Sequence, residues 1–204
     1  MELPRRIVVG GKNIDGIGKF LKSLKNTKEV SIVSGNNVKK IVQKKINRSL
    51  SASKIKKTWY LADNNNLKTI YKIEKKIRQS KNDLIVGIGG GRSVDIAKMI
   101  GFDIGKPFVS VPTSASHDGI ASPFVSIKGE KPHSMVATAP LGVFVDVDII
   151  KKAPKKLLAS GCGDLVAKIT AVRDWELGRD KTGEYYGRYL SLIHISEPTR
   201  PRLI

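Results

Sequence analysis

Short runs of branched apolar residues alternate with amphipathic stretches along the first 150 residues. Apolar residues three and four positions apart predict helices, and the apolar runs between them predict strands. The run from Leu84 to Ile88 is apolar at nearly every position, which is typical of a strand covered on both faces. This alternation predicts an α/β layer with a parallel sheet. The expected strands are residues 5–9, 29–33, 57–61, 84–88, 107–111 and 142–146, and the expected helices are residues 14–24, 38–46, 67–77 and 93–100.

The pattern changes after residue 111. Residues 112–121 predict a loop rich in serine and threonine, and two apolar runs at 123–127 and 134–137 predict a β-hairpin insert. From Ala153 onward the pattern is helical, and Pro154 stands at a first-turn position that tolerates proline. We therefore expect an α/β domain over residues 1–150 and the start of a helical domain over residues 151–189.

Residues 190–204 differ abruptly from the lysine-rich stretch before them. The eleven residues LSLIHISEPTR resemble the in-frame translation of a sequencing-library adapter. We expect this tail to be non-native, so that the helical domain is truncated, and we exclude His194 from any site. A native strand followed by a proline-rich terminus is the alternative.

Composition indicates a globular chain: 40% of the 204 residues are hydrophobic and 6% are aromatic. No apolar run approaches the roughly 20 residues that a membrane helix needs, so we expect no stable membrane insertion. The first residues lack the apolar core and cleavage site of a signal peptide. The single cysteine, Cys162, excludes an internal disulfide, and we expect it to be a small packed residue. These features predict a cytoplasmic protein.

The formal net charge of +19 needs an explanation. The lysines occur as separate pairs, such as Lys39–Lys40 and Lys75–Lys76, mostly on expected helix surfaces. A solvated basic surface is the first interpretation, and steering of an anionic substrate is the second. RNA-recognition motifs and zinc-finger spacings are absent, so we expect no nucleic-acid partner.

A glycine turn follows the strand at residues 84–88. Gly89, Gly90 and Gly91 let the backbone approach a ligand closely, and their amides at a helix N-terminus favour an anion. The turn departs from the G-x-G-x-x-G fingerprint because Arg92 occupies the sixth position from Gly87. It also lacks the Gly-Lys-Ser/Thr ending of a P-loop. The residues alone therefore predict a turn that can hold a phosphate group, and a purely structural glycine turn is the alternative.

Three stretches carry a resemblance to a known family. GGGRSVDIAK, residues 89–98, resembles the GGGxxxDxAK signature of the superfamily of glycerol dehydrogenase, iron-containing alcohol dehydrogenase and dehydroquinate synthase. PTSASHDGIASP (112–123) and SGCGDLVAKITAVRDWELG (160–178) resemble archaeal sn-glycerol-1-phosphate dehydrogenases. The resemblance covers residues 3–188. It implies a Rossmann-like parallel sheet with a hairpin insert, followed by the first helices of an incomplete all-α domain.

The resemblance implies NAD(P)H-dependent reduction of dihydroxyacetone phosphate to sn-glycerol-1-phosphate, the backbone of archaeal membrane ether lipids. The cofactor would lie at the carboxyl ends of the parallel strands. The turn after the second strand has no acidic residue to repel a 2′-phosphate, so NADP(H) is expected as well as NAD(H). The implied cofactor-binding residues are Gly35 and Asn36 for the adenosine ribose, Gly89, Gly90, Gly91, Arg92 and Ser93 for the pyrophosphate, and Thr113, Ser114, Ser116 and Ser122 for the nicotinamide half.

By the same resemblance, Asp118 and Asp164 are the catalytic and substrate-binding candidates. Asp164 is also the implied ligand of a Zn²⁺ ion that would polarise the ketone. The other two ligands are expected to be histidines of the missing part, so we expect this chain to be inactive. The sequence leaves the oligomeric state of the full-length protein open, with a homo-oligomer among the possibilities. We expect His117 to line the active site at most, and we place His133 on the hairpin.

Two alternatives remain. One is a glycerol or other alcohol dehydrogenase of the same superfamily. The other, from a different class, is a non-catalytic protein whose basic surface binds nucleotides or nucleic acid.

Overall fold

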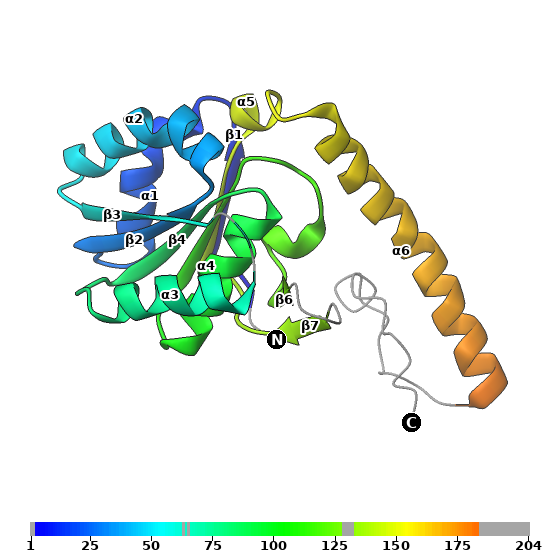
Figure 1. Cartoon of the computed structure of the whole chain (residues 1–204). Helices are drawn as coiled ribbons and strands as arrows, with labels where there is room; N and C mark the ends of the chain where they lie inside the picture. The colour runs from blue at the N-terminus through cyan, green and yellow to red at the C-terminus, as the bar shows by residue number, and fades with distance from the viewer. Residues whose placement is uncertain (1–2, 63, 65, 128–132, 184–204) are drawn as a thin grey trace.

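Six parallel strands form the central sheet, in the order β1-β8-β5-β4-β2-β3 (Figure 1). The structure, a computed structural model, describes residues 3–62, 64, 66–127 and 133–183. The predicted α/β class with a parallel, Rossmann-like sheet is confirmed, and every expected strand is present within one residue of its predicted bounds. The sheet strands are β1 (Arg6–Gly10), β2 (Glu29–Ser34), β3 (Lys56–Leu61), β4 (Leu84–Gly89), β5 (Phe108–Pro112) and β8 (Gly142–Asp146).

The helices agree in place with the prediction, but α2 and α4 are longer than predicted at both ends. The first predicted helix begins with a 3-10 turn, η1, before α1, and α2 continues six residues past its predicted end at Ile46. Leu50 explains the longer α2, because it repeats the buried position of Ile46 one turn later and is 1% exposed. The helices are η1 (Asn13–Gly16), α1 (Ile17–Leu24), α2 (Asn36–Ala52), α3 (Leu67–Arg78), α4 (Gly91–Asp103), η2 (Asp118–Ile120), α5 (Val147–Ile150) and α6 (Lys155–Thr182).

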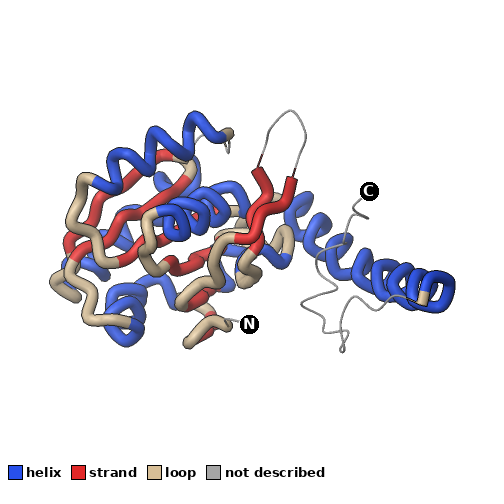
Figure 2. The backbone as a smooth tube through the Cα atoms, turned by 90° about the horizontal axis from the view of Figure 1, so that it is seen from below, coloured by secondary structure: helices blue, strands red, loops and turns tan. Residues whose placement is uncertain are grey.

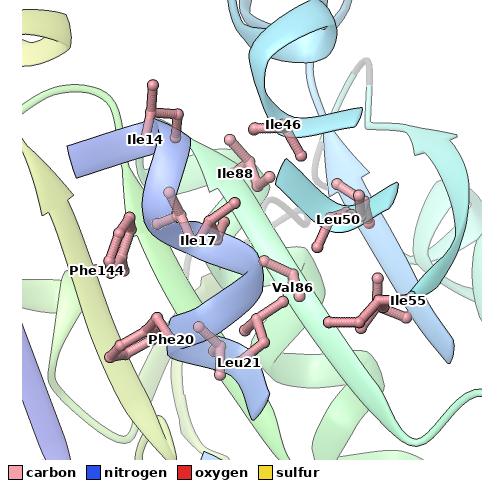
Figure 3. Packing of buried hydrophobic residues seen from close by; sticks show 14 of the residues in the cluster. Ile14, Ile17, Phe20, Leu21, Ile46, Leu50, Ile55, Val86, Ile88 and Phe144 are labelled. Atoms are coloured by element: carbon pink, nitrogen blue, oxygen red, sulfur yellow. The ribbon is translucent and has the colours of Figure 1, made fainter. Parts of the chain in front are cut away.

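Two hydrophobic clusters, one on each face of the sheet, form the core. The α1–α2 side packs Phe20 and Leu21 over the strands, with Ile46 and Leu50 beside them (Figure 3). The α3–α4 side contains apolar residues of those two helices and of the hairpin. Strand β4 serves both: Leu84, Val86 and Ile88 belong to the first cluster and Ile85 to the second. The prediction that this strand is buried on both faces is therefore confirmed.

Gly87 is the point of closest approach between β4 and α4. A Cβ atom on Gly87 would lie 2.8 Å from the Ala97 Cβ and 3.1 Å from the Val94 Cα. The absence of a side chain lets α4 lie directly on the strand that precedes it. The N-terminus of α4 is thereby held at the end of β4.

The predicted hairpin is present as β6 (Phe124–Ile127) and β7 (His133–Val136), which pair antiparallel beside the main sheet (Figure 2). Phe124 pairs with Val136 in register. Val125 and Ala137 anchor the hairpin, since both belong to the cluster under α3 and α4.

Helix α6 runs away from the sheet as a single long helix (Figures 1 and 2). Its apolar residues Leu165 and Ile169 are exposed. Cys162 is exposed as well, so its expected packing is wrong, because no neighbouring helix of the described part covers this face of α6. The expected domain boundary near Ile150 coincides with the end of α5 and stays a prediction. Residues 190–204 lie outside the described residues. Among the residues that the structure describes, no helix is long and apolar enough to cross a membrane.

We predict that Gly87→Ala destabilises the fold because the added methyl group overpacks the contact between β4 and α4. The expected loss is about 1–3 kcal/mol in the free energy of unfolding, measured by urea denaturation. Gly16→Ala is the matched control, since a Cβ at Gly16 would meet no atom within 4 Å. Equal stability of the two variants would contradict the close packing.

Candidate functional site

The direction of strand succession reverses between β2 and β4. From β2 the chain passes to its outer neighbour β3, whereas from β4 it passes to β5 on the opposite side. Ligands of open α/β sheets bind beside such a switch point, at the carboxyl ends of the strands. The turns after both strands meet there: the Gly35 N–H donates a hydrogen bond to the Ser93 Oγ at 3.1 Å.

The glycine turn connects β4 to α4 at this switch point. Gly89 has a φ of 152°, a conformation that favours glycine, and a Cβ there would lie 2.7 Å from the Ser93 Oγ. Gly90 is the N-cap of α4, and no side chain caps the helix. The N-terminus of α4 therefore presents its amides and the positive end of its dipole at the carboxyl end of β4.

Ser114 lies beside this turn and is 2% exposed. The Thr113 N–H donates to the Gly89 carbonyl at 2.8 Å, which places the start of the loop against the turn. The Ser114 Oγ is 3.2 Å from where a Cβ on Gly90 would stand, and it has no hydrogen-bond partner within the described ranges. A buried hydroxyl without a partner is costly. The turn therefore fits a ligand with phosphoryl oxygens that would accept from this hydroxyl and the helix amides.

Lys98, two turns along α4, is the largest fully buried side chain among the described residues. Its Nζ donates to the carbonyl oxygens of Gly119 at 2.8 Å and Phe124 at 2.5 Å, and lies 3.6 Å from the Asp95 Oδ1. The ammonium group thus joins α4 to η2 and to the base of the hairpin. Burial raises the pKa of Asp95, while the positive charge of Lys98 opposes that rise.

The two predicted aspartates are neighbours. The Asp118 N–H donates to the Asp164 Oδ2 at 3.1 Å. The Lys168 Nζ lies 2.9 Å from the Asp118 Oδ2 and 3.7 Å from the Asp164 Oδ2, so one ammonium group serves both carboxylates. The sequence analysis missed Lys168, although its position four residues after Asp164 on an expected helix was a usable signal.

Helix α6 reaches this cluster because Gly161 has no side chain. A Cβ on Gly161 would collide with the Ala115 carbonyl oxygen of the loop. The close approach brings Asp164, about one turn further along α6, to the Asp118 backbone.

The structure gathers most of the sequence-predicted residues into two adjoining groups. Gly35, the three glycines, Ser93, Thr113 and Ser114 surround the turn, and Asp118 and Asp164 form the second group. Arg92 and Asn36 directly follow Gly91 and Gly35 in the chain and are exposed, whereas the Ser122 Oγ accepts from the Phe124 N–H at the start of the hairpin. Ser116 makes no hydrogen bond to the turn within the described part of the chain.

Asp164 is the metal ligand that the sequence predicts, and its role stays a prediction. Among the described residues, no group of three or more His, Cys, Asp or Glu side chains is arranged to hold a metal ion. Since catalytic zinc usually takes three protein ligands, these residues do not by themselves fit a zinc centre. The carboxylate of Asp164 fits as one ligand of such a centre.

Comparison with known proteins identifies related sequences. Residues 8–154 match the family described as iron-containing alcohol dehydrogenase. The chain is 61% identical over 189 residues to a glycerol-1-phosphate dehydrogenase [NAD(P)+] of Nitrosopumilus maritimus, covering 93% of this chain and 53% of the relative. It is 60% identical over 195 residues to the enzyme of the same name from Cenarchaeum symbiosum, covering 96% of this chain and 55% of the relative. The chain spans about half the length of these curated relatives.

Solved structures share the fold. The crystal structure of glycerol dehydrogenase from Schizosaccharomyces pombe superposes with a TM-score of 0.76 at 25% identity, covering 86% of this chain and 46% of that chain. A probable glycerol dehydrogenase from Sinorhizobium meliloti superposes with a TM-score of 0.73 at 22% identity, covering 82% of this chain and 46% of that chain.

We predict that Lys98→Met lowers the free energy of unfolding by about 3–5 kcal/mol, because it leaves the Asp95 carboxylate and two carbonyl groups without their buried cation. Urea denaturation followed by tryptophan fluorescence measures the loss. Lys75→Met, on the exposed face of α3, is the control and should change stability by less than about 0.5 kcal/mol. A Lys98 variant as stable as the Lys75 variant would refute the structural role of the buried ammonium.

Proposed function

Because the chain belongs to the iron-containing alcohol dehydrogenase family, we propose that it forms the dinucleotide-binding part of an NAD(P)-dependent sn-glycerol-1-phosphate dehydrogenase. The observation that carries the proposal is the uncapped glycine turn at the strand switch point, with the unpartnered Ser114 hydroxyl beside it. The names of the two curated relatives described above supply the substrate class.

The cofactor lies across the carboxyl ends of β2, β4 and β5. Its pyrophosphate binds the three glycines, Arg92 and Ser93, and its adenosine ribose lies beside Gly35 and Asn36. No acidic side chain is present between Ser34 and Asn37, so a 2′-phosphate meets no repulsion there and NADPH binds as well as NADH. The nicotinamide half extends along the loop towards Asp118 and contacts residues Thr113, Ser114, Ser116 and Ser122.

The substrate is dihydroxyacetone phosphate, which binds between the nicotinamide and the aspartate pair. Asp118 and Asp164 orient it, and Lys168 holds the two carboxylates together. Asp164 would also be one ligand of a Zn²⁺ ion in the whole protein, where such an ion supplies Lewis-acid polarisation of the ketone. Hydride transfer from the reduced nicotinamide then yields sn-glycerol-1-phosphate.

The wider setting follows from the product. sn-Glycerol-1-phosphate is the backbone of archaeal membrane ether lipids, so we assign the whole protein to lipid biosynthesis, and we place it in the cytoplasm. The basic surface attracts the two anionic ligands.

We predict saturable binding of NADPH to this chain, measured by the fluorescence of the reduced nicotinamide. Gly90→Val places a side chain towards the Ser114 hydroxyl and should weaken binding at least tenfold, whereas Gly16→Ala should bind like the wild type. Excess duplex DNA should leave NADPH binding unchanged. Salt-sensitive DNA binding without NADPH binding would contradict the proposal and indicate a nucleic-acid-binding protein.

We predict that the 204-residue chain binds NADPH but does not reduce dihydroxyacetone phosphate, even with added Zn²⁺. The reason is that Asp164 is the one candidate metal ligand that we can name, and catalytic zinc usually takes three protein ligands. NADPH oxidation followed at its absorbance maximum tests this, and zinc-dependent turnover would contradict the ligand assignment.

A further inference from the structure

The side chain of His117 connects the N-termini of two helices. Its Nδ1 accepts a hydrogen bond from the Gly119 N–H at 2.9 Å and so caps η2. Its Nε2 lies against Gly91, the first residue of α4, where a Cβ on Gly91 would collide with it. The ring therefore lies at the edge of the same glycine turn that Ser114 borders.

The hydrogen bond at Nδ1 determines which nitrogen carries the proton. A neutral imidazole has one donor and one acceptor, and Nδ1 is occupied as the acceptor. The neutral ring consequently carries its proton on Nε2, which makes this atom a donor. Within the described part of the chain, the Nε2–H has no hydrogen-bond partner.

Three kinds of donor thus converge on one turn. The uncapped N-terminus of α4 contributes backbone amides. Ser114 contributes a buried hydroxyl without a partner, and His117 contributes Nε2–H from a ring that is already held in place. Donors arranged in this way suit a ligand with several phosphoryl oxygens.

The two glycines that flank the ring are part of the same arrangement. A Cβ on Gly119 would lie 2.5 Å from the His117 Cε1, and a Cβ on Gly91 would displace the Nε2. The third glycine of the turn therefore leaves room for the histidine as well as for the ligand. This dependence links the motif at residues 89–91 to the loop at residues 117–119.

We propose that His117 is a cofactor-binding residue, which donates a hydrogen bond from Nε2 to a phosphoryl oxygen of the dinucleotide's pyrophosphate. This assignment rests on the proposed function, because it needs the dinucleotide in the glycine turn. A substrate phosphate has the same acceptor chemistry, but the position of Nε2 at the first residue of α4 favours the pyrophosphate.

Two substitutions separate the two nitrogens of the ring. His117→Asn keeps an oxygen near the position of Nδ1, so it can still cap η2, but it lacks a donor at Nε2. His117→Gln reaches the Nε2 position with an amide N–H. Calorimetric titration with NADPH, ADP and adenosine should give a Kd about tenfold higher for NADPH and ADP in the Asn variant, as expected for a lost hydrogen bond to a charged group. Adenosine, which has no phosphate, should bind both variants like the wild type, and the Gln variant should recover part of the loss.

Gly91→Ala provides an independent check, because its methyl group should push the ring from the turn and weaken ADP binding. The same change should have a much smaller effect when His117 is already Asn, so the two substitutions should be non-additive. Thermal melts confirm that each variant is folded.

Unchanged ADP and NADPH affinities in a folded Asn variant would overturn the assignment and leave the proposed function standing. That result, together with weaker binding of dihydroxyacetone phosphate, would move His117 to the substrate. Failure of the wild-type chain to bind NADPH would overturn both proposals.

Discussion

The geometry of the site depends on the contacts of one buried group, the ammonium of Lys98. It lies 0% exposed among three oxygen partners that belong to α4, η2 and the start of the hairpin. A buried charge is tolerated only when it is paired and hydrogen-bonded. Separation of these three segments would therefore leave an unpaired cation in apolar surroundings. Helix α4 is itself seated on β4 through Gly87. The position of the sheet is therefore transmitted through Lys98 to the loop that carries His117 and Asp118.

The two lysines near the site, Lys98 and Lys168, have opposite electrostatic surroundings. Around Lys98, carbonyl oxygens and one carboxylate satisfy a fully buried cation. Around Lys168, one cation lies between two carboxylates whose side chains are about one-third exposed. The first arrangement is rigid because water cannot replace its partners. In the second, the carboxylates remain partly open to solvent, where ion pairs contribute little stability.

The strands and the fold class could be predicted from the sequence because their signals are local. An apolar run such as residues 84–88 predicts a buried strand once helical stretches flank it. Three consecutive glycines likewise predict the turn that follows it. The end of α2 was not predicted because three consecutive polar residues, Asn47, Arg48 and Ser49, interrupt the apolar pattern before the buried Leu50. The exposure of Cys162 was missed because packing depends on neighbours that the sequence does not reveal. Long-range partners could not be predicted for the same reason. Lys98 belongs to the motif at residues 89–98, but the carbonyl groups that accept its hydrogen bonds, at Gly119 and Phe124, are more than 20 residues away in the sequence.

Helix α6 shows how a single missing side chain can bring distant residues together. At Gly161 the helix backbone lies against the Ala115 carbonyl, and any larger residue would push the helix away from the loop. The Asp164 carboxylate would then lose the Asp118 N–H, and Lys168 could no longer reach both aspartates. Beyond that contact α6 leaves the sheet, with Leu165 and Ile169 exposed on its surface. The aspartate pair therefore forms through contacts at one end of α6, independent of what covers the rest of the helix.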